Sequence, residues 1–183
     1  HRTYLCGTIV TPRHTREQHP ISFGYLLTKD RIIICDDAGV AYGMLQRIRE
    51  ENPQLTPNIG GLLYGFLELL IAKDMHHLQE LEEKLSRLEE QVLEGLLDNF
   101  NHQITALRKE LMSWSHYYTQ LEDMVFEFGE NENKFFTDIE MRQFHMIEKR
   151  IARLKNEAQM LRGYGLQIRE LFQAEIDIRQ NRI

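Results

Sequence analysis

The chain has few of the features that define several large protein classes. Only Cys6 and Cys35 are cysteines among its 183 residues, so a disulfide framework is excluded and a reducing compartment is the simpler expectation. No apolar run reaches the roughly 18 residues of a membrane-spanning helix, and no signal peptide is visible. The sequence therefore predicts a chain that does not itself enter a membrane.

The chain also lacks the motifs of the common enzyme classes. It contains no P-loop, no Gly-x-Gly-x-x-Gly, no His-Glu-x-x-His and no Gly-x-Ser-x-Gly, so we predict that it is not an enzyme. Its formal net charge of −6 argues against a nucleic-acid-binding protein, because phosphate contacts need clustered Lys and Arg. Eight histidines are present, which raises the question of a metal site. The adjacent His76 and His77 would diverge by about 100° on a helix, so they cannot easily bind one ion together. We interpret the histidines as surface residues.

The first part of the chain is rich in β-branched and aromatic residues. Three runs are typical of strands: residues 3–10, 21–28 and 31–35. Two residues separate the second run from the third, which is the spacing of a hairpin. Residues 11–20 are polar and contain two prolines, which predicts a loop. Residues 42–51 have helical spacing that ends before Asn52-Pro53. We expect a small antiparallel sheet followed by a helix.

From residue 60 to residue 183 there is no proline, and apolar residues recur every three or four positions. That period predicts three long helices. The first has the row Leu67, Ile71, Met75, Leu78, Leu81, Leu85, Leu88 and Val92, and the second has Ile104, Leu107, Leu111, Trp114, Tyr118, Leu121, Val125 and Phe128. The third has Ile147, Ile151, Leu154, Ala158, Leu161, Gly165, Ile168 and Phe172, an unbroken spacing that is typical of a coiled-coil-like seam.

Small and polar residues mark the ends of these helices. Gly95 lies at the weak joint between the first two helices, where the chain could turn or continue with a kink. Gly129 is predicted as the C-terminal residue of the second helix, and Thr137 or Asp138 as the N-cap of the third. In the third helix, Gly163 and Gly165 are interpreted as places where helices approach closely or where the helix bends.

Near its end, the third helix has a polar face opposite Phe172. Glu170, Ala174, Asp177 and Asn181 follow one another at steps of four, three and four residues, so they lie along one narrow side. The simpler interpretation is a solvated helix face. The alternative is that several copies of the helix surround an axis, so that these residues form stacked polar rings. Rings of carboxylate and amide oxygens select hydrated cations, and Mg²⁺ prefers oxygen ligands.

The same stretch resembles the stalk helix of the CorA-type magnesium and divalent-cation transporters. The similar segments are 161–170 (LRGYGLQIRE), 172–174 (FQA) and 177–183 (DIRQNRI). Earlier segments resemble the helix and loop before that stalk: 107–111 (LRKEL), 117–123 (YYTQLED), 130–136 (ENENKFF), Phe144 and 150–154 (RIARL). The similarity runs in order from about residue 20 to residue 183 and ends where a membrane helix would begin in the family.

The resemblance implies an α+β cytosolic fold. Residues 1–136 would form an N-terminally truncated domain with a small sheet and long antiparallel helices, and residues 137–183 an extended stalk helix leading to absent transmembrane segments. It also implies a homopentamer in the cell membrane, with this fragment on the cytoplasmic side; the isolated fragment is compatible with a monomer. The transported and regulatory ion would be Mg²⁺, with Co²⁺, Ni²⁺ or Zn²⁺ as alternatives, and no organic cofactor is implied. Glu170, Ala174, Asp177 and Asn181 would line the pore.

One family motif is altered. Many members have Tyr-Phe-Arg-Asp-x-x-Asp early in the stalk, whose acidic residues help to bind a regulatory metal. The corresponding residues 143–149 read QFHMIEK, so Met146 and Lys149 replace both acidic positions. Glu148 is the candidate substitute, although it points about 100° away from Lys149 around a helix. The ligands of any regulatory metal are therefore unknown.

A different class of function is also compatible with the sequence. A soluble coiled-coil interaction or scaffold protein could dimerise along the seam from Ile147 to Phe172. The first residue is His1 rather than methionine, and Ile183 falls inside a helical pattern, so we expect both ends to be cut from a longer chain. Hydrophobic spans after Ile183 would favour the transporter over the scaffold.

Overall fold

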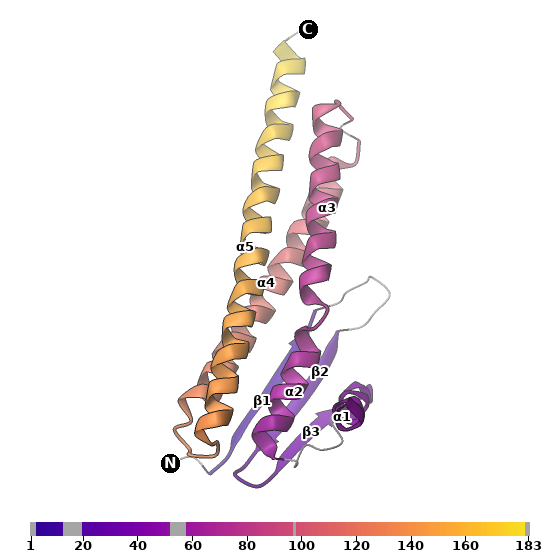
Figure 1. Cartoon of the computed structure of the whole chain (residues 1–183). Helices are drawn as coiled ribbons and strands as arrows, with labels where there is room; N and C mark the ends of the chain where they lie inside the picture. The colour runs from indigo at the N-terminus through magenta and orange to yellow at the C-terminus, as the bar shows by residue number, and fades with distance from the viewer. Residues whose placement is uncertain (1–2, 13–19, 52–57, 97, 182–183) are drawn as a thin grey trace. The chain divides into compact units, whose positions relative to one another are not determined.

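The computed structural model describes residues 3–12, 20–51, 58–96 and 98–181, and the structural statements below refer to these ranges. Three antiparallel strands form one sheet in the order β1-β2-β3 (Figure 1). They are β1 (Leu5–Thr11), β2 (Ile21–Leu27) and β3 (Ile32–Asp36). The predicted antiparallel sheet is confirmed. Most of the predicted loop at 11–20, and the pair Asn52-Pro53, lie outside the described ranges.

One face of the sheet carries the core. Phe23 and Leu27 on β2 are almost fully buried. Tyr25, between them, pairs with Gly7 on β1, and a Cβ at Gly7 would lie 2.7 Å from the Tyr25 hydroxyl. The glycine therefore makes room for the ring, which packs edge-on against Phe128 with centroids 6.1 Å apart.

The described residues form five helices after the sheet. They are α1 (Val40–Glu51), α2 (Ile59–Ile71), α3 (Asp74–Leu93), α4 (Phe100–Glu130) and α5 (Asp138–Asn181) (Figure 1). Side chains cap the first two. Asp36 accepts hydrogen bonds from the N–H groups of Ala38 and Ala41 at 2.9 and 2.6 Å, and Asn58 accepts one from the N–H of Gly61 at 2.6 Å.

The first of the three predicted long helices is in fact two helices, so that detail of the prediction is wrong. The regular hydrogen bonding of α2 ends at Ile71, where the N–H of Ala72 bonds to Leu69, three residues back instead of four. Helix α3 starts at Asp74, which is buried. The apolar row continues across the break because both helices keep the same spacing. Periodicity alone therefore could not reveal the break.

The ends of α3 and α4 are set by left-handed residues. After α3, Gly95 has φ +77°, and the N–H groups of Gly95 and Leu96 bond to the carbonyls of Val92 and Gln91, which is a Schellman motif. The chain turns at Gly95, which settles the choice between a turn and a kink. After α4 the left-handed residue is Asn131 with φ 50°, so the assignment of this role to Gly129 was wrong.

Helix α5 begins with a capping box. The Thr137 N–H donates to Glu140 Oε2 at 2.7 Å, and the Glu140 N–H is 3.4 Å from Thr137 Oγ1. This confirms the N-cap predicted at Thr137 or Asp138. The Glu140 carboxylate is buried and lies against Gly60 in the first turn of α2, so tightly that a Cβ on Gly60 would overlap it.

The apolar row predicted for α5 is buried over its whole length. We call its members the inner row: Ile147, Ile151, Leu154, Ala158, Leu161, Gly165, Ile168 and Phe172. Gly165 is a place of close approach, with Leu85, Ile104 and Arg108 within 4 Å of its Cβ position, whereas Gly163 has open space there. A dimer along this seam would need an exposed surface. The single chain already covers it, so the structure does not favour the scaffold hypothesis.

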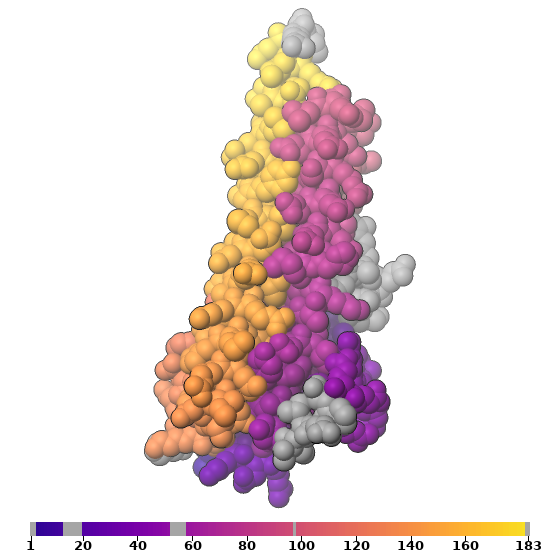
Figure 2. Space-filling model, in the orientation of Figure 1, coloured from indigo at the N-terminus to yellow at the C-terminus, as the bar shows by residue number. Residues whose placement is uncertain are grey.

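The chain divides into two compact units, which we describe separately. Unit 1 consists of His1–Lys73 and Tyr117–Arg153, and its core joins the sheet to α2 through the edge-on pair Phe23–Phe66 at 5.5 Å. In unit 2, Asp74–His116 and Leu154–Ile183, α3 and the C-terminal part of α5 meet along their side chains (Figure 2). The separation of residues 1–136 from a stalk of residues 137–183 concerns the role of the helix and stays a prediction.

Candidate functional site

The four predicted pore-facing residues lie together on the exposed side of α5. Glu170, Ala174, Asp177 and Asn181 are all exposed, and the Gln173 amide donates a hydrogen bond to Asp177 Oδ1 at 3.0 Å. The inner-row residue Phe172 is buried on the opposite side of the helix. The end of α5 therefore has one side packed against its own chain and one side that carries two carboxylates and an amide.

This exposed side continues along the whole of α5, which the sequence reasoning missed. The outer row steps by three and four residues and every member is exposed: Ile139, Arg142, Met146, Lys149, Arg153, Asn156, Met160, Gly163, Gln167, Glu170, Ala174, Asp177 and Asn181. Three large apolar side chains in it are about 60% exposed: Ile139 (65%), Met146 (60%) and Met160 (61%). The outer row has the same heptad spacing as the inner row, but its residues are chemically mixed, so the spacing was not recognised in the sequence.

The altered regulatory motif lies on the first half of α5. Met146 and Lys149 belong to the outer row, while Glu148 is half-buried and its Oε2 lies 3.3 Å from His145 Nδ1. Glu148 thus contacts a histidine on its own helix, on a different side from Met146 and Lys149. Its role as a substitute metal ligand stays a prediction.

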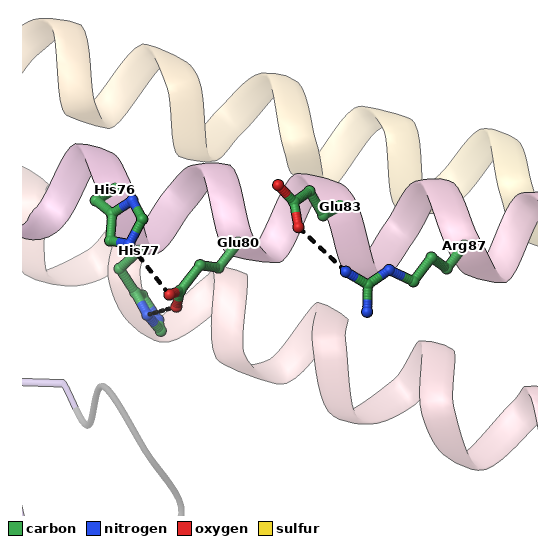
Figure 3. A network of polar contacts seen from close by, with 5 residues as sticks. All are labelled: His76, His77, Glu80, Glu83 and Arg87. Carbon is green, nitrogen blue, oxygen red and sulfur yellow. Dashed lines mark hydrogen bonds and ion pairs between the residues drawn. The ribbon is translucent and has the colours of Figure 1, made fainter.

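His77 on α3 is buried, so its interpretation as a surface residue was wrong. Its Nε2 lies 3.1 Å from Glu110 Oε1 on α4, its Nδ1 lies 3.6 Å from Glu80 Oε2, and its ring is 4.9 Å from that of Trp114. His76 is exposed, as predicted, and its Nε2 lies 3.3 Å from the other oxygen of Glu80 (Figure 3). The carboxylates of Glu80 and Glu110 therefore lie beside both ring nitrogens of the buried His77, which the sequence could not distinguish from His76.

The other candidate features are groups of metal-ligating side chains and internal cavities. Across the described ranges no three His, Cys, Asp or Glu side chains are grouped so as to hold a metal ion. A cavity of about 70 Å³ lies between β1 and α4, and another of about 20 Å³ lies under the sheet. Both are far below the ~300 Å³ of a typical small-molecule site. We take the exposed outer row of α5 as the candidate functional surface.

None of the helices in the described part of the chain is both long and apolar enough to cross a membrane.

In unit 2, Tyr164 donates a hydrogen bond to Glu89 Oε2 at 2.6 Å. Partial burial and this carboxylate raise the pKa of the Tyr164 hydroxyl above its ordinary value. The contact joins α5 to α3 on the flank of the inner row and leaves the outer row free of it.

The sequence model of the CorA-like Mg²⁺ transporter protein family matches residues 8–183. The chain belongs to this family. No curated protein has a significantly similar sequence. The family match covers unit 1 from residue 8 onward, unit 2, and the whole of α5 with its inner and outer rows.

Solved structures show the same fold at low identity. The CorA magnesium transporter of Methanocaldococcus jannaschii matches with a TM-score of 0.81 and 18% identity, over 98% of this chain and 58% of that one. Its soluble domain matches with 0.77 and 18%, over 95% and 71%. The cytoplasmic domain of ZntB from Vibrio parahaemolyticus matches with 0.77 and 15%, over 96% and 70%. The CorA-like chain thus spans little more than half of a complete CorA.

Proposed function

We propose that this CorA-like chain is the cytosolic part of a homo-oligomeric divalent-cation channel. Residues 1–136 form its cytosolic domain, and residues 137–183 form a stalk that leads to membrane segments and couples the cytosolic domain to gating. Glu170, Ala174, Asp177 and Asn181 line the inner pore. The proposal rests on family membership and on one structural observation, the exposed outer row of α5.

The two rows of α5 support this assignment because they separate two tasks. The inner row is buried against the same chain, with Ile147 and Ile151 in unit 1 and the members from Leu154 onward in unit 2. The outer row faces away from it and is free to meet other copies around an axis. Towards the C-terminus the outer row changes from Met160 and Gly163 to Glu170, Asp177 and Asn181. Oxygen-bearing side chains in a ring attract and coordinate hydrated cations.

The cation class and the assembly follow from the same reasoning. Mg²⁺ is the first candidate for the transported ion because the family is named for it and because oxygen ligands suit it. Co²⁺, Ni²⁺ and Zn²⁺ are the alternatives. We propose a pentamer in the cell membrane, with this part on the cytoplasmic side, and no enzymatic activity.

Flux through the full-length protein in liposomes tests the pore assignment. Asp177→Lys should lower Mg²⁺ uptake about tenfold, because a ring of positive charge replaces a ring of negative charge. Asn181→Leu should also lower it, since an apolar ring offers no oxygen to the hydration shell. Glu175→Lys and Gln180→Leu are matched controls, because these residues neighbour the outer row but do not belong to it.

The controls make the outcome specific. Uptake that is unchanged in both Asp177→Lys and Asn181→Leu would remove these residues from the pore. A wild-type protein that transports none of the four cations would refute the channel itself. The same assay tests regulation: because Met146 and Lys149 stand where the family has acidic ligands, raising Mg²⁺ on the cytosolic side should leave uptake uninhibited.

A further inference from the structure

The end of α5 is only weakly packed against the rest of unit 2. Phe172 is its last buried residue, and its ring stacks on that of Phe100 with centroids 4.0 Å apart and planes at 11°. Residues 173–181 are exposed or half-buried. The helix segment that carries Asp177 and Asn181 therefore extends about 13 Å beyond its last buried side chain, at 1.5 Å per residue.

Arg179 ties this segment back to the turn between α3 and α4. Its Nη2 donates a hydrogen bond to the carbonyl oxygen of Gly95 at 2.8 Å. The two residues are 84 positions apart in the sequence, and both belong to unit 2. Within the described residues 173–181, this hydrogen bond joins the segment to another part of unit 2.

Gly95 is built to receive that side chain. Its φ of +77° is a conformation that glycine adopts without strain, and it closes the Schellman motif at the end of α3. A Cβ on Gly95 would overlap the guanidinium group of Arg179. The missing side chain of Gly95 thus serves two purposes, the turn of the backbone and the space in which the guanidinium lies.

The position of Arg179 on the helix gives the contact its consequence. Arg179 is two residues after Asp177 and two before Asn181, so it points about 200° away from each. Arg179 therefore contacts the rest of unit 2 from one side of the helix, while Asp177 and Asn181 lie on the opposite, exposed side. Because Arg179 follows Phe172 by seven positions, the two anchors lie two turns apart on the same side, and together they fix the rotation of the last turns.

We propose that Arg179 is a positioning residue of the pore: its hydrogen bond to Gly95 sets the rotation at which α5 presents Asp177 and Asn181. The consequence for transport rests on the proposed function. The hydrogen bond from Arg179 to Gly95, which we call the clamp, can be tested without transport. Losing the clamp lets residues 173–181 of α5 rotate, which misaligns the polar ring while leaving the rest of the fold intact.

Amide hydrogen exchange on the 183-residue chain tests the clamp. Arg179→Met should speed exchange in residues 173–181 about fivefold, which corresponds to losing ~1 kcal/mol of net hydrogen bonding. Arg179→Lys keeps one donor within reach and should restore much of the protection. Gly95→Ala should act like Arg179→Met, because the added methyl group displaces the guanidinium.

Two variants separate the clamp from general effects. Arg169→Met removes an exposed arginine elsewhere on α5 and should leave residues 173–181 unchanged. Gly39→Ala imposes the same backbone strain at φ +70° but has open space at its Cβ, so it should also leave them unchanged. Equal exchange in wild type and Arg179→Met would overturn the clamp, as would equal effects of Gly95→Ala and Gly39→Ala on this segment.

Uptake in liposomes then tests the consequence. Arg179→Met should lower Mg²⁺ uptake severalfold with an unchanged melting temperature, and Arg179→Lys should recover it, whereas Arg169→Met should match wild type. If wild type transports and Arg179→Met transports equally well despite faster exchange, the positioning role is wrong although the clamp exists. If wild type does not transport, the proposed function fails, and the exchange result still decides whether Arg179 holds the helix end.

Discussion

The contact between Glu140 and Gly60 makes a sharp quantitative prediction. These residues are 80 positions apart, yet a Cβ on Gly60 would overlap the Glu140 carboxylate. Glu140→Ala removes the acceptor of hydrogen bonds from the Thr137 N–H at 2.7 Å and the Thr137 hydroxyl at 2.9 Å. Losing this cap and part of a buried side chain should cost about 2–3 kcal/mol of unfolding free energy.

Gly60→Ala alone should also destabilise the chain. The added methyl group must displace a buried carboxylate, which costs about 1–3 kcal/mol, and the better helix propensity of alanine offsets up to ~1 kcal/mol of that. In the Glu140→Ala background the obstacle is gone. There the same methyl group fills the vacated space and should be neutral or stabilising.

The double-mutant cycle therefore has a predicted coupling. If the effects were independent, the double variant would lose roughly 4 kcal/mol, whereas we expect a loss of only about 2 kcal/mol. Urea unfolding followed by circular dichroism measures each corner. In a chain of this length the difference corresponds to about 4–8 °C in melting temperature.

Glu140→Gln is the control for charge. Glutamine keeps the size and one acceptor oxygen, so Gly60→Ala should cost as much in this background as in wild type. Additive effects in the Glu140→Ala cycle, within about 0.5 kcal/mol, would refute the close contact between α5 and the first turn of α2. If the cost of Gly60→Ala also disappeared in the Glu140→Gln background, charge and not space would link the two residues.

Two further predictions concern single positions. Burial, followed by the nearby Glu127 carboxylate and the Cys6 thiol, raises the pKa of Tyr25 to about 12 from its ordinary 10.0, so folding favours the protonated hydroxyl. The stability that it contributes is fully present below pH 10 and is lost as the pH rises from 10 to 12, by about 2 kcal/mol. The urea midpoints of wild type and Tyr25→Phe should therefore diverge at pH 11.5 but not at pH 8. A parallel decline of the two midpoints with pH would contradict this. In α5, Gly163→Ala should stabilise the chain by up to ~1 kcal/mol because its Cβ position is open. Gly165→Leu should destabilise it by about 1–3 kcal/mol because Leu85 and Ile104 already fill the space. Equal urea midpoints of the two variants would contradict the different packing of the two glycines.

Much of the fold was determined locally and could be predicted from sequence. The three strands follow from β-branched runs with hairpin spacing, and the inner row of α5 follows from an apolar period that every one of its residues obeys. The N-cap at Thr137 was also predictable, because a hydroxyl before a helical stripe and a glutamate three residues later is a local pattern. Each of these signals lies within one turn or one strand pair.

Other features depended on tertiary contacts. The break between α2 and α3 leaves the apolar row in phase, so the row could not show it. His76 and His77 are adjacent and chemically identical, and His77 is the buried one because α4 places Glu110 and Trp114 beside its ring. Asn131 rather than Gly129 ended α4 because its side chain pairs with Phe136, donating to its carbonyl and accepting from its N–H.

The candidate site shows the same division. The sequence by itself placed Glu170, Ala174, Asp177 and Asn181 on one side of a helix, since residue spacing and the geometry of the α-helix decide that. It did not reveal that this side stays exposed along all of α5, because exposure depends on which side the other helices cover. Nor did it reveal the clamp from Arg179 to Gly95, since a backbone carbonyl has no sequence signature and only the folded chain brings it within 2.8 Å of a guanidinium 84 residues away.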